Sequence, residues 1–251
     1  QIYCDFGGYS TIAVGSAKML GVELMENFNT PYLSMSTAEF WRRWHISLST
    51  WFRDYVYIPL GGNRKGKERK YLNIMITFGL SGLWHGAQWT YVFWGLLNGF
   101  YQVIGDMLKP LRDWGVKTFD LHRDSLGHKT VKVLVTFMLI NFAWVFFRAP
   151  QLSDAFDMLR GAFTAANPWI LFDGSLYECG LDRPNFDLML AGIALLIGAD
   201  ICKYRGIKLR ELIVKQDAWC QSLVIALSVS LILLFGIFGG NEAANFIYFQ
   251  F

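Results

Sequence analysis

The chain has 251 residues, of which 53% are apolar and 17% aromatic, and its mean hydropathy is +0.29. This composition excludes an ordinary soluble domain and is typical of membrane proteins. The net charge is only +3, and the lysines and arginines gather in a few connectors, so the sequence does not indicate nucleic-acid binding.

The start of the chain and its cysteines carry little functional information. The chain begins at Gln1 without the charged segment and apolar core of a signal peptide, and we expect it to be the later part of a longer protein. The cysteines lack the spacing of a zinc site or a disulfide framework, although Cys179 could pair with a partner outside this sequence. The four are Cys4, Cys179, Cys202 and Cys220.

The first expected helix covers residues 2–20, which are apolar and rich in small side chains. Small residues allow close helix contact, and the glycines are expected to break this helix. Residues 26–32 predict a loop. A second helix is then predicted by a capping box, in which Ser36 and Glu39 each satisfy a free backbone N–H at the helix start.

The helical period continues from this capping box to Ile58. One broad face consists of Phe40, Trp41, Trp44, Leu48, Trp51, Phe52, Tyr55 and Ile58. A narrow polar stripe consists of Arg42, His45, Ser49 and Arg53. An amphipathic helix so rich in aromatic residues is expected to lie at a membrane interface or to line a polar cavity.

The stretch from Tyr71 to Gly105 contains no Asp, Glu, Lys or Arg, and its one histidine is His85. It exceeds the roughly 20 residues of a single membrane span. We therefore expect two helices, or one span and a re-entrant piece, that turn back near His85.

Three later segments are expected to span the membrane, at residues 133–147, 188–199 and 222–240. The connectors at 63–70, 106–130 and 200–217 each carry five Lys or Arg, whereas 148–187 carries three against six Asp or Glu. The positive-inside rule places the three basic connectors in the cytoplasm. The 148–187 connector and the C-terminus are then extracytoplasmic.

An ionisable residue such as His85 inside a membrane segment is a functional candidate, although a histidine can also simply hydrogen-bond between helices. Gly79, Gly82 and Gly86 remove side-chain bulk around it, which would let either a helix or a substrate approach. Trp84 and Trp89 could form apolar walls. Burial favours the neutral imidazole, which is the form that a general base requires.

His45 has two interpretations that the residues leave open. With Arg42 and Arg53 on the same stripe it could hold a phosphate or carboxylate, or the stripe could face anionic lipid headgroups. Asp54 is the expected ion-pair partner of Arg53. The sequence contains no GxSxG, Walker, GxGxxG or HExxH motif, so an enzyme of this sequence would use histidines in a membrane cavity.

Two long motifs resemble the membrane-bound O-acyltransferase family, in its bacterial alginate O-acetyltransferase-like branch. They are FWRRWHISLSTWFRDYVYIPLGGNRKG (Phe40 to Gly66) and SGLWHGAQWTYVFWGLLNG (Ser81 to Gly99). The opening QIYCDFGGYSTIAVGSAKMLG and the closing FIYFQF also resemble this branch.

The resemblance implies an all-α, polytopic helical bundle around a buried tunnel. Residues 1–251 would form the later part of this bundle, as one membrane domain that lacks the N-terminal helices. It implies that His85 is catalytic and that His45 is the second characteristic histidine. We expect Trp84, Arg42, Arg53 and Asn98 to contact substrate. No metal and no tightly bound cofactor is expected.

The implied reaction uses acetyl-CoA or a carrier-bound acyl thioester from the cytoplasm as donor. His85 would act as general base on an acceptor hydroxyl, with His45 or a backbone N–H stabilising the oxyanion, although an acyl-histidine intermediate is an alternative. The expected acceptor is an extracytoplasmic polysaccharide such as alginate, reached through an extracytoplasmic acetyltransferase- or esterase-like partner protein. The protein itself is expected to lie in the bacterial inner membrane, in contact with its lipids. D-alanyl transfer, peptidoglycan acylation, a transporter and a non-catalytic scaffold remain as alternatives.

Overall fold

The computed structural model describes residues 1–164, 167–178 and 180–236. Over these residues the chain is helical, and its strand-like pairing is limited to an isolated antiparallel bridge between Phe28 and Trp44. The expected all-α fold is therefore confirmed. Cys179, the closing FIYFQF and the end of the span expected at 222–240 lie outside the described residues.

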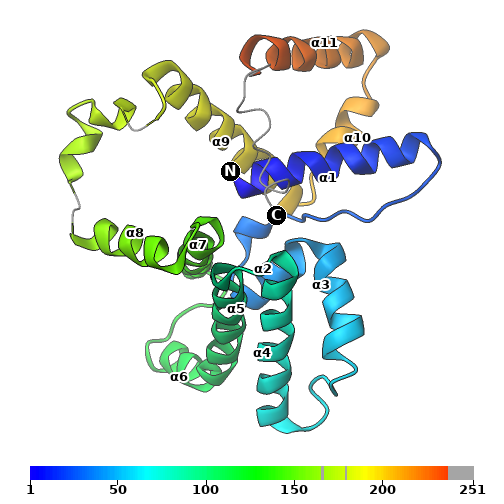
Figure 1. The fold of residues 1–251 in the computed structure, drawn as a ribbon. Helices are drawn as coiled ribbons and strands as arrows, with labels where there is room; N and C mark the ends of the chain where they lie inside the picture. The colour runs from blue at the N-terminus through cyan, green and yellow to red at the C-terminus, as the bar shows by residue number, and fades with distance from the viewer. Residues whose placement is uncertain (165–166, 179, 237–251) are drawn as a thin grey trace. The chain divides into compact units, whose positions relative to one another are not determined.

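The chain forms two compact units. The first consists of Gln1–Phe6 and Pro168–Phe251, and the second consists of Gly7–Asn167. The second unit contains most of α1 (Ile2–Met19), α2 (Thr37–Arg43), α3 (Ile46–Phe52), α4 (Gly66–His85), α5 (Trp89–Met107), α6 (Lys109–Thr118), α7 (Leu126–Arg148) and α8 (Leu152–Thr164) (Figure 1). It also contains a 3-10 turn at Pro31–Leu33 and a π-helical turn at Arg53–Tyr57. The described part of the first unit contains 3-10 turns at Pro168–Leu171 and Ser175–Glu178, and the helices α9 (Arg183–Tyr204), α10 (Leu209–Val214) and α11 (Ala218–Phe235).

Helices α4 and α5 form the hairpin expected for residues 71–105, and they lie side by side in Figure 1. A Cβ at Gly82 would lie 2.4 Å from the carbonyl oxygen of Tyr91, and one at Gly95 would lie 2.3 Å from that of Phe78. The two backbones therefore touch at a point where neither helix has a side chain. The glycines near His85 were expected to let either a helix or a substrate approach, and Gly82 serves the contact between helices.

The open end of this hairpin is joined by polar contacts. Lys70 forms an ion pair of 2.9 Å with Asp106, and the Tyr71 hydroxyl donates to the same carboxylate at 3.0 Å. At the other end, α4 stops at His85 because Gly86 has a φ of 153°. A side chain is strained at this φ, and a Cβ there would also lie 2.8 Å from the Tyr91 ring.

Helix α7 packs on α5 and completes an aromatic core. The Trp94 and Trp144 rings stack with centroids 5.6 Å apart, and Phe147 contacts Trp94 at 4.9 Å. Trp41 of α2 adds an edge contact to Trp94 at 5.5 Å. The core of this unit thus lies where α2, α5 and α7 meet, next to the end of α4.

The long helix predicted from the capping box to Ile58 is wrong. Helix α2 ends at Arg43 and α3 starts at Ile46, with His45 between them in the left-handed conformation at φ 45°. The chain then continues through a π-helical turn rather than a regular helix. The break has a physical cause, because the loop at 27–29 pairs with the backbone here: Asn29 N–H donates to Arg43 O, and Ile46 N–H donates to Asn27 O, both at 3.0 Å.

The predicted helix start is confirmed, with one shift in the capping pattern. Ser36 accepts from Glu39 N–H at 3.1 Å, as expected. The Glu39 carboxylate accepts from the N–H of Met35, one residue earlier than the cap, at 2.9 Å. It also pairs with Arg43 at 2.8 Å, and Arg43 donates to Thr30 at 2.8 Å. This cluster fastens the 27–35 loop to α2.

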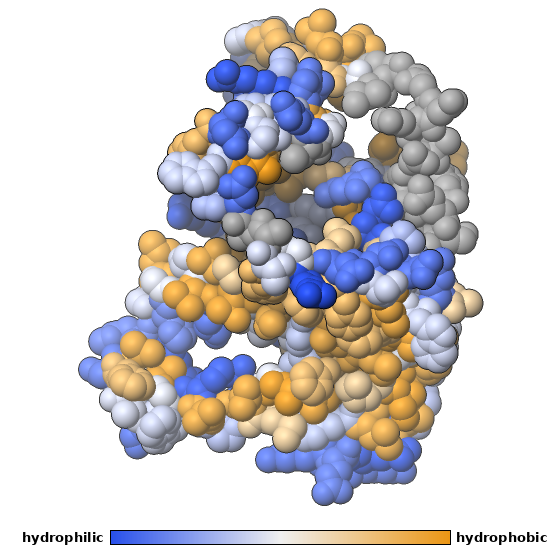
Figure 2. Space-filling model, turned by 60° about the vertical axis from the view of Figure 1, so that its left-hand side comes forward, coloured by the Kyte–Doolittle hydropathy of each residue, from blue (hydrophilic) through white to orange (hydrophobic). Residues whose placement is uncertain are grey.

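Three helices in the described part of the chain are long and apolar enough to cross a membrane, namely α7, α9 and α11. Helices α7 and α9 contain the spans expected at 133–147 and 188–199 and extend beyond both of their ends, whereas α11 begins before residue 222 and ends at Phe235. Helices α4 and α5 are outside this set because aromatic and polar residues and the basic start of α4 lower their hydropathy. Large apolar side chains are exposed over much of the visible surface (Figure 2).

The break expected in the first helix is wrong, because α1 is continuous from Ile2 to Met19. No described atom lies within 4 Å of a Cβ at Gly8 or Gly15, so these glycines do not mark a helix contact. In the first unit, the Tyr3 hydroxyl donates to the Asp200 carboxylate at 3.2 Å, which joins the start of α1 to α9.

The glycine contact between α4 and α5 predicts an asymmetric response to alanine. Gly95→Ala should destabilise the full-length protein by about 1–3 kcal/mol because its Cβ meets the Phe78 carbonyl. Gly105→Ala on the same helix has open space around it and should be neutral or slightly stabilising. Thermal unfolding in detergent would measure both, and equal melting temperatures for the two variants would contradict the contact.

Candidate active site

His85 is the last residue of α4 and is only 7% exposed. Its ring has edge contacts with Trp94 and Phe147, both at 5.2 Å between centroids, and with the adjacent Trp84 at 4.9 Å. Among the described residues, none forms a hydrogen bond with this imidazole. The expectation that His85 simply bridges helices by hydrogen bonds is not supported, since an apolar cage surrounds it instead.

His45 occupies the break between α2 and α3. A left-handed conformation in a residue other than glycine is uncommon and typically strained by about 1–3 kcal/mol. It is held here by the backbone pairing of the 27–29 loop and by Ser47, whose hydroxyl lies 3.5 Å from His45 Nδ1. Burial lowers the pKa of His45 to about 4, so this imidazole is neutral near pH 7.

The two histidines share one tryptophan neighbour. The ring of Trp84 is 6.3 Å from that of His45 and 4.9 Å from that of His85, with edge-on geometry in both pairs. The histidines are also close enough to interact electrostatically. The structure thus brings together the centres of two motifs that are separated in sequence.

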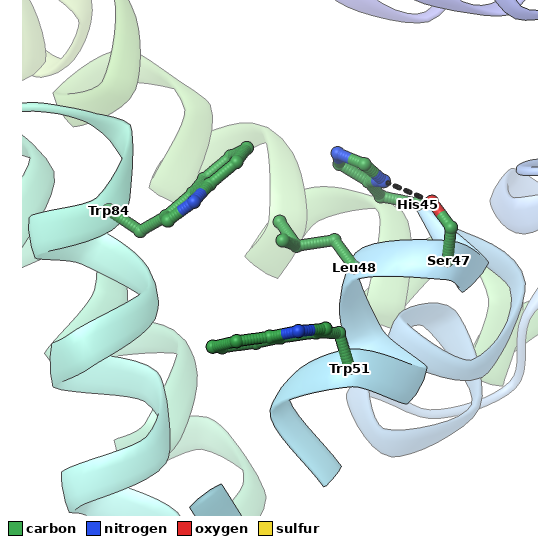
Figure 3. Close-up of a pocket in the computed structure, with 5 residues that line it drawn as sticks. All are labelled: His45, Ser47, Leu48, Trp51 and Trp84. Atoms are coloured by element: carbon green, nitrogen blue, oxygen red, sulfur yellow. Dashed lines mark hydrogen bonds between the residues drawn. The ribbon is translucent and has the colours of Figure 1, made fainter. Parts of the chain in front are cut away.

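A pocket of about 370 Å³ opens at this place (Figure 3). Its lining residues are His45, Ser47, Leu48, Trp51 and Trp84. Figure 3 shows the indole rings of Trp51 and Trp84 extending from two different helices toward the same space, with the His45 ring beside Ser47. Both tryptophans are about half exposed, so their faces are available to a ligand. His85 contacts Trp84 but is not a lining residue of the pocket.

The other residues expected to bind substrate do not line this pocket. Arg42 is exposed on α2. Arg53 is exposed and pairs with Asp54 at 2.7 and 3.1 Å, which confirms the expected ion pair. Asn98 is fully buried: it accepts from Trp41 Nε1 at 3.2 Å and donates to Trp94 O at 2.8 Å. Of the four, the structure places only Trp84 at the pocket.

Sequence reasoning missed several residues of the site. Ser47 and Leu48 enter the pocket because the chain breaks at His45, which no periodicity signals. Trp94 and Phe147 cage His85 from two further helices, and aromatic residues are too frequent here to single these two out. Within the described residues there is no cluster of three His, Cys, Asp or Glu side chains that could hold a metal ion.

Comparison with known proteins bears directly on these two motifs. Residues 1–165, which include both histidines, match the model of the membrane-bound O-acyltransferase family. The chain is 46% identical over 196 residues to the probable alginate O-acetylase AlgI of Pseudomonas aeruginosa, an alignment that covers 78% of this chain and 34% of that protein.

Two further relatives differ in the acceptor that their names give. The peptidoglycan O-acetyltransferase of Helicobacter pylori is 34% identical over 261 residues, covering 100% of this chain and 47% of that protein. The teichoic acid D-alanyltransferase of Streptococcus thermophilus is 33% identical over 154 residues, covering 56% and 36%. The chain therefore spans about one third to one half of the length of these relatives.

The family model matches well over half of the chain, and the histidines of both motifs meet at Trp84 in the folded structure. On this evidence the chain belongs to the membrane-bound O-acyltransferase family.

Proposed function

We propose that the protein containing this chain transfers an acyl group, most simply acetyl, from a thioester donor to hydroxyls of an extracytoplasmic polysaccharide. The observation that carries this proposal is the buried His85 imidazole, which has no hydrogen-bond partner among the described residues and lies next to the pocket that His45 lines. A neutral imidazole surrounded by rings is suited to proton transfer with a substrate that enters the site.

In the proposed reaction, His85 accepts the proton of the acceptor hydroxyl as its oxygen attacks the thioester carbonyl. The C–S bond then breaks, and the imidazolium returns the proton to the departing thiolate, so that an ester and a thiol are produced. General-base catalysis of this kind contributes roughly 10²–10⁴ in rate. An acyl-histidine intermediate is the competing course. The donor is a substrate, such as acetyl-CoA or a carrier-bound acyl thioester, rather than a resident cofactor.

The relatives guide the choice of acceptor. Identity is higher to the alginate O-acetylase than to the peptidoglycan O-acetyltransferase or the teichoic acid D-alanyltransferase. This supports acetylation of an exopolysaccharide such as alginate, with an extracytoplasmic partner protein completing the transfer. Peptidoglycan is the second candidate, since that relative aligns with the whole chain.

We propose a multi-pass arrangement in the bacterial inner membrane. The basic connectors 63–70, 106–130 and 200–217 support a cytoplasmic location for these segments, which puts the thioester donor on the same side. The connector 148–187 and the C-terminus are then extracytoplasmic. Arg42 and Arg53, both exposed, are proposed to contact an anionic group of the substrate, while Asn98 supports the core beneath Trp41.

His85→Ala in the full-length protein is expected to lower acyl transfer at least 10²-fold, because the general base is lost. The measurement is ester-bound acetyl on the exported polymer, with protein level checked in the membrane. His122→Ala is the matched control, because this histidine lies in an exposed connector. Unchanged acetylation in the His85 variant would refute the proposal.

His45 predicts how stability responds to acid. Its folded pKa of about 4 lies below the ordinary histidine value of 6.5, so between these values the unfolded chain binds a proton that the folded chain does not. The contribution of this group to the free energy of unfolding is complete above pH 6.5 and is lost as the pH falls toward 4. Melting temperatures of the full-length protein should therefore fall less on acidification in His45→Asn than in wild type. Parallel curves for the two proteins would show that His45 is not buried as neutral imidazole.

A further inference from the structure

Helix α6, which follows α5 directly, has an apolar side that is exposed in the described chain. At 100° per residue this side consists of Leu108, Leu111, Trp114, Thr118 and Phe119, of which the first and last flank the helix. The four large apolar side chains among them are between 44 and 70% exposed. Contact of so many apolar side chains with water is unfavourable, so this side of α6 calls for a partner.

Exposed cations border this apolar side along both of its edges. Arg112 follows Leu108 by four residues and is its neighbour on one edge of the helix surface. Lys117 follows Trp114 by three residues and is its neighbour on the other edge. Lys109 lies on the opposite, polar side. Helix α6 is therefore amphipathic, with positive charge on each flank of its apolar side.

A second basic segment lies at the same end of the α4–α5 hairpin. Residues 64–70 lead into α4, and the ion pair of 2.9 Å between Lys70 and Asp106 joins the start of α4 to the end of α5. Figure 1 shows the start of α4 and the end of α5 at one end of the hairpin, with α6 beside α5. The exposed cations of this second segment are Arg64, Lys65, Lys67 and Arg69.

Acidic residues neutralise only part of this charge. Residues 64–118 contain eight Lys or Arg but only three Asp or Glu. Asp106 pairs with Lys70, and Asp113 pairs with Arg123 at 2.6 Å, so Glu68 is the remaining acid. Among the described residues no ion pair is formed by Arg64, Lys65, Lys67, Arg69, Lys109, Arg112 or Lys117. The two segments together therefore present a surface that suits an anionic partner.

The position of the cations favours a lipid layer over a protein segment as this partner. A protein segment packed on the apolar side would cover its edges and remove Arg112 and Lys117 from water, which is costly for charges without an ion pair. A lipid layer takes the apolar side into its acyl chains and leaves both edges at the level of the phosphates. Tryptophan, here Trp114, is also typical of side chains at this depth.

We infer that α6 lies flat in the membrane–water interface with its apolar side among the acyl chains, and that its cations and those of residues 64–70 together bind the phosphates of anionic lipid headgroups. This inference goes beyond the proposed function, because it concerns the lipid that the protein binds rather than the reaction. Since α4 begins at this basic end and stops at His85, the same lipid contact would hold the hairpin that carries the proposed base.

The first test measures the depth of α6 in a bilayer. The full-length protein, with its other cysteines replaced by serine, is spin-labelled at Leu111→Cys in nanodiscs that contain phosphatidylglycerol. Oxygen, which partitions into lipid, should relax this label strongly, and a water-soluble nickel chelate should relax it weakly. A label at Lys109→Cys, two residues away on the opposite side of the helix, is the matched control and should show the reverse order.

The same measurement separates lipid from the other possible surroundings of α6. A label at position 111 that neither reagent reaches would show that protein covers the apolar side. A label there that the nickel chelate reaches would show that the apolar side faces water. Either result would overturn the inference.

The second test measures selectivity for the headgroup. The full-length protein in neutral detergent should bind dye-labelled phosphatidylglycerol about 10-fold more tightly than phosphatidylcholine with the same dye, and added salt should reduce this ratio. Loss of three cations in the combined variant Lys109→Gln, Arg112→Gln and Lys117→Gln should lower the affinity for phosphatidylglycerol at least about 5-fold. Its affinity for phosphatidylcholine should not change.

A second triple variant controls for the overall charge of the protein. Arg205→Gln, Arg210→Gln and Lys215→Gln remove the same charge from exposed positions of the 200–217 connector, and this variant should keep the wild-type selectivity. Equal binding of the two lipids by the wild-type protein would overturn the inference. An equal loss of affinity in the two triple variants would also overturn it, because the binding would then follow net charge rather than this surface.

The inference and the proposed function fail in different ways, because neither of these two measurements depends on turnover. If acyl transfer depends on His85 but the label at position 111 is not in lipid, the inference is overturned and the proposed function stands. If that label is in lipid but the wild-type protein transfers no acyl group, the proposed function is refuted and the lipid contact is supported.

Discussion

The backbone contact between Gly82 and Gly95 is the constraint on which the candidate site depends. With no side chain on either helix at this point, α4 and α5 approach closely enough for Trp94 to contact His85. Phe147 closes the cage from α7, which also packs on α5. An imidazole in such surroundings has lost water and has no hydrogen-bond partner among the described residues, which is the basis of its proposed role in catalysis.

The two histidines are held by opposite means. His85 is fixed by apolar rings, whereas His45 is fixed by a chain of polar contacts that runs from Ser10 through Asn27 to Ser47. Rings exclude water without offering a hydrogen bond, whereas the polar chain places a hydroxyl beside the imidazole. The ring of Trp84 contacts both histidines, so the proposed base His85 and the polar chain at His45 meet at one side chain.

Local signals in the sequence were sufficient for the elements that depend on nearby residues. The capping residues Ser36 and Glu39 mark the start of α2, and the charge-free stretch marks the hairpin. The break at His45 was not predictable, because it is produced by the loop at 27–29, whose pairing leaves no trace in the helical period. The site followed the same division: the motifs indicated His85, His45 and Trp84, while Ser47 and Asn27 emerged only from the folded chain.

The left-handed backbone at His45 has a consequence for how this protein responds to selection. Glycine or asparagine would adopt φ 45° with less strain, so the position is one where stability and activity favour different residues. A library screened for thermal resistance alone would be drawn away from histidine here, whereas under the proposed function a screen for acyl transfer would return to it. A strained backbone at a residue that lines a pocket therefore marks that residue for a functional test even where a motif is unfamiliar.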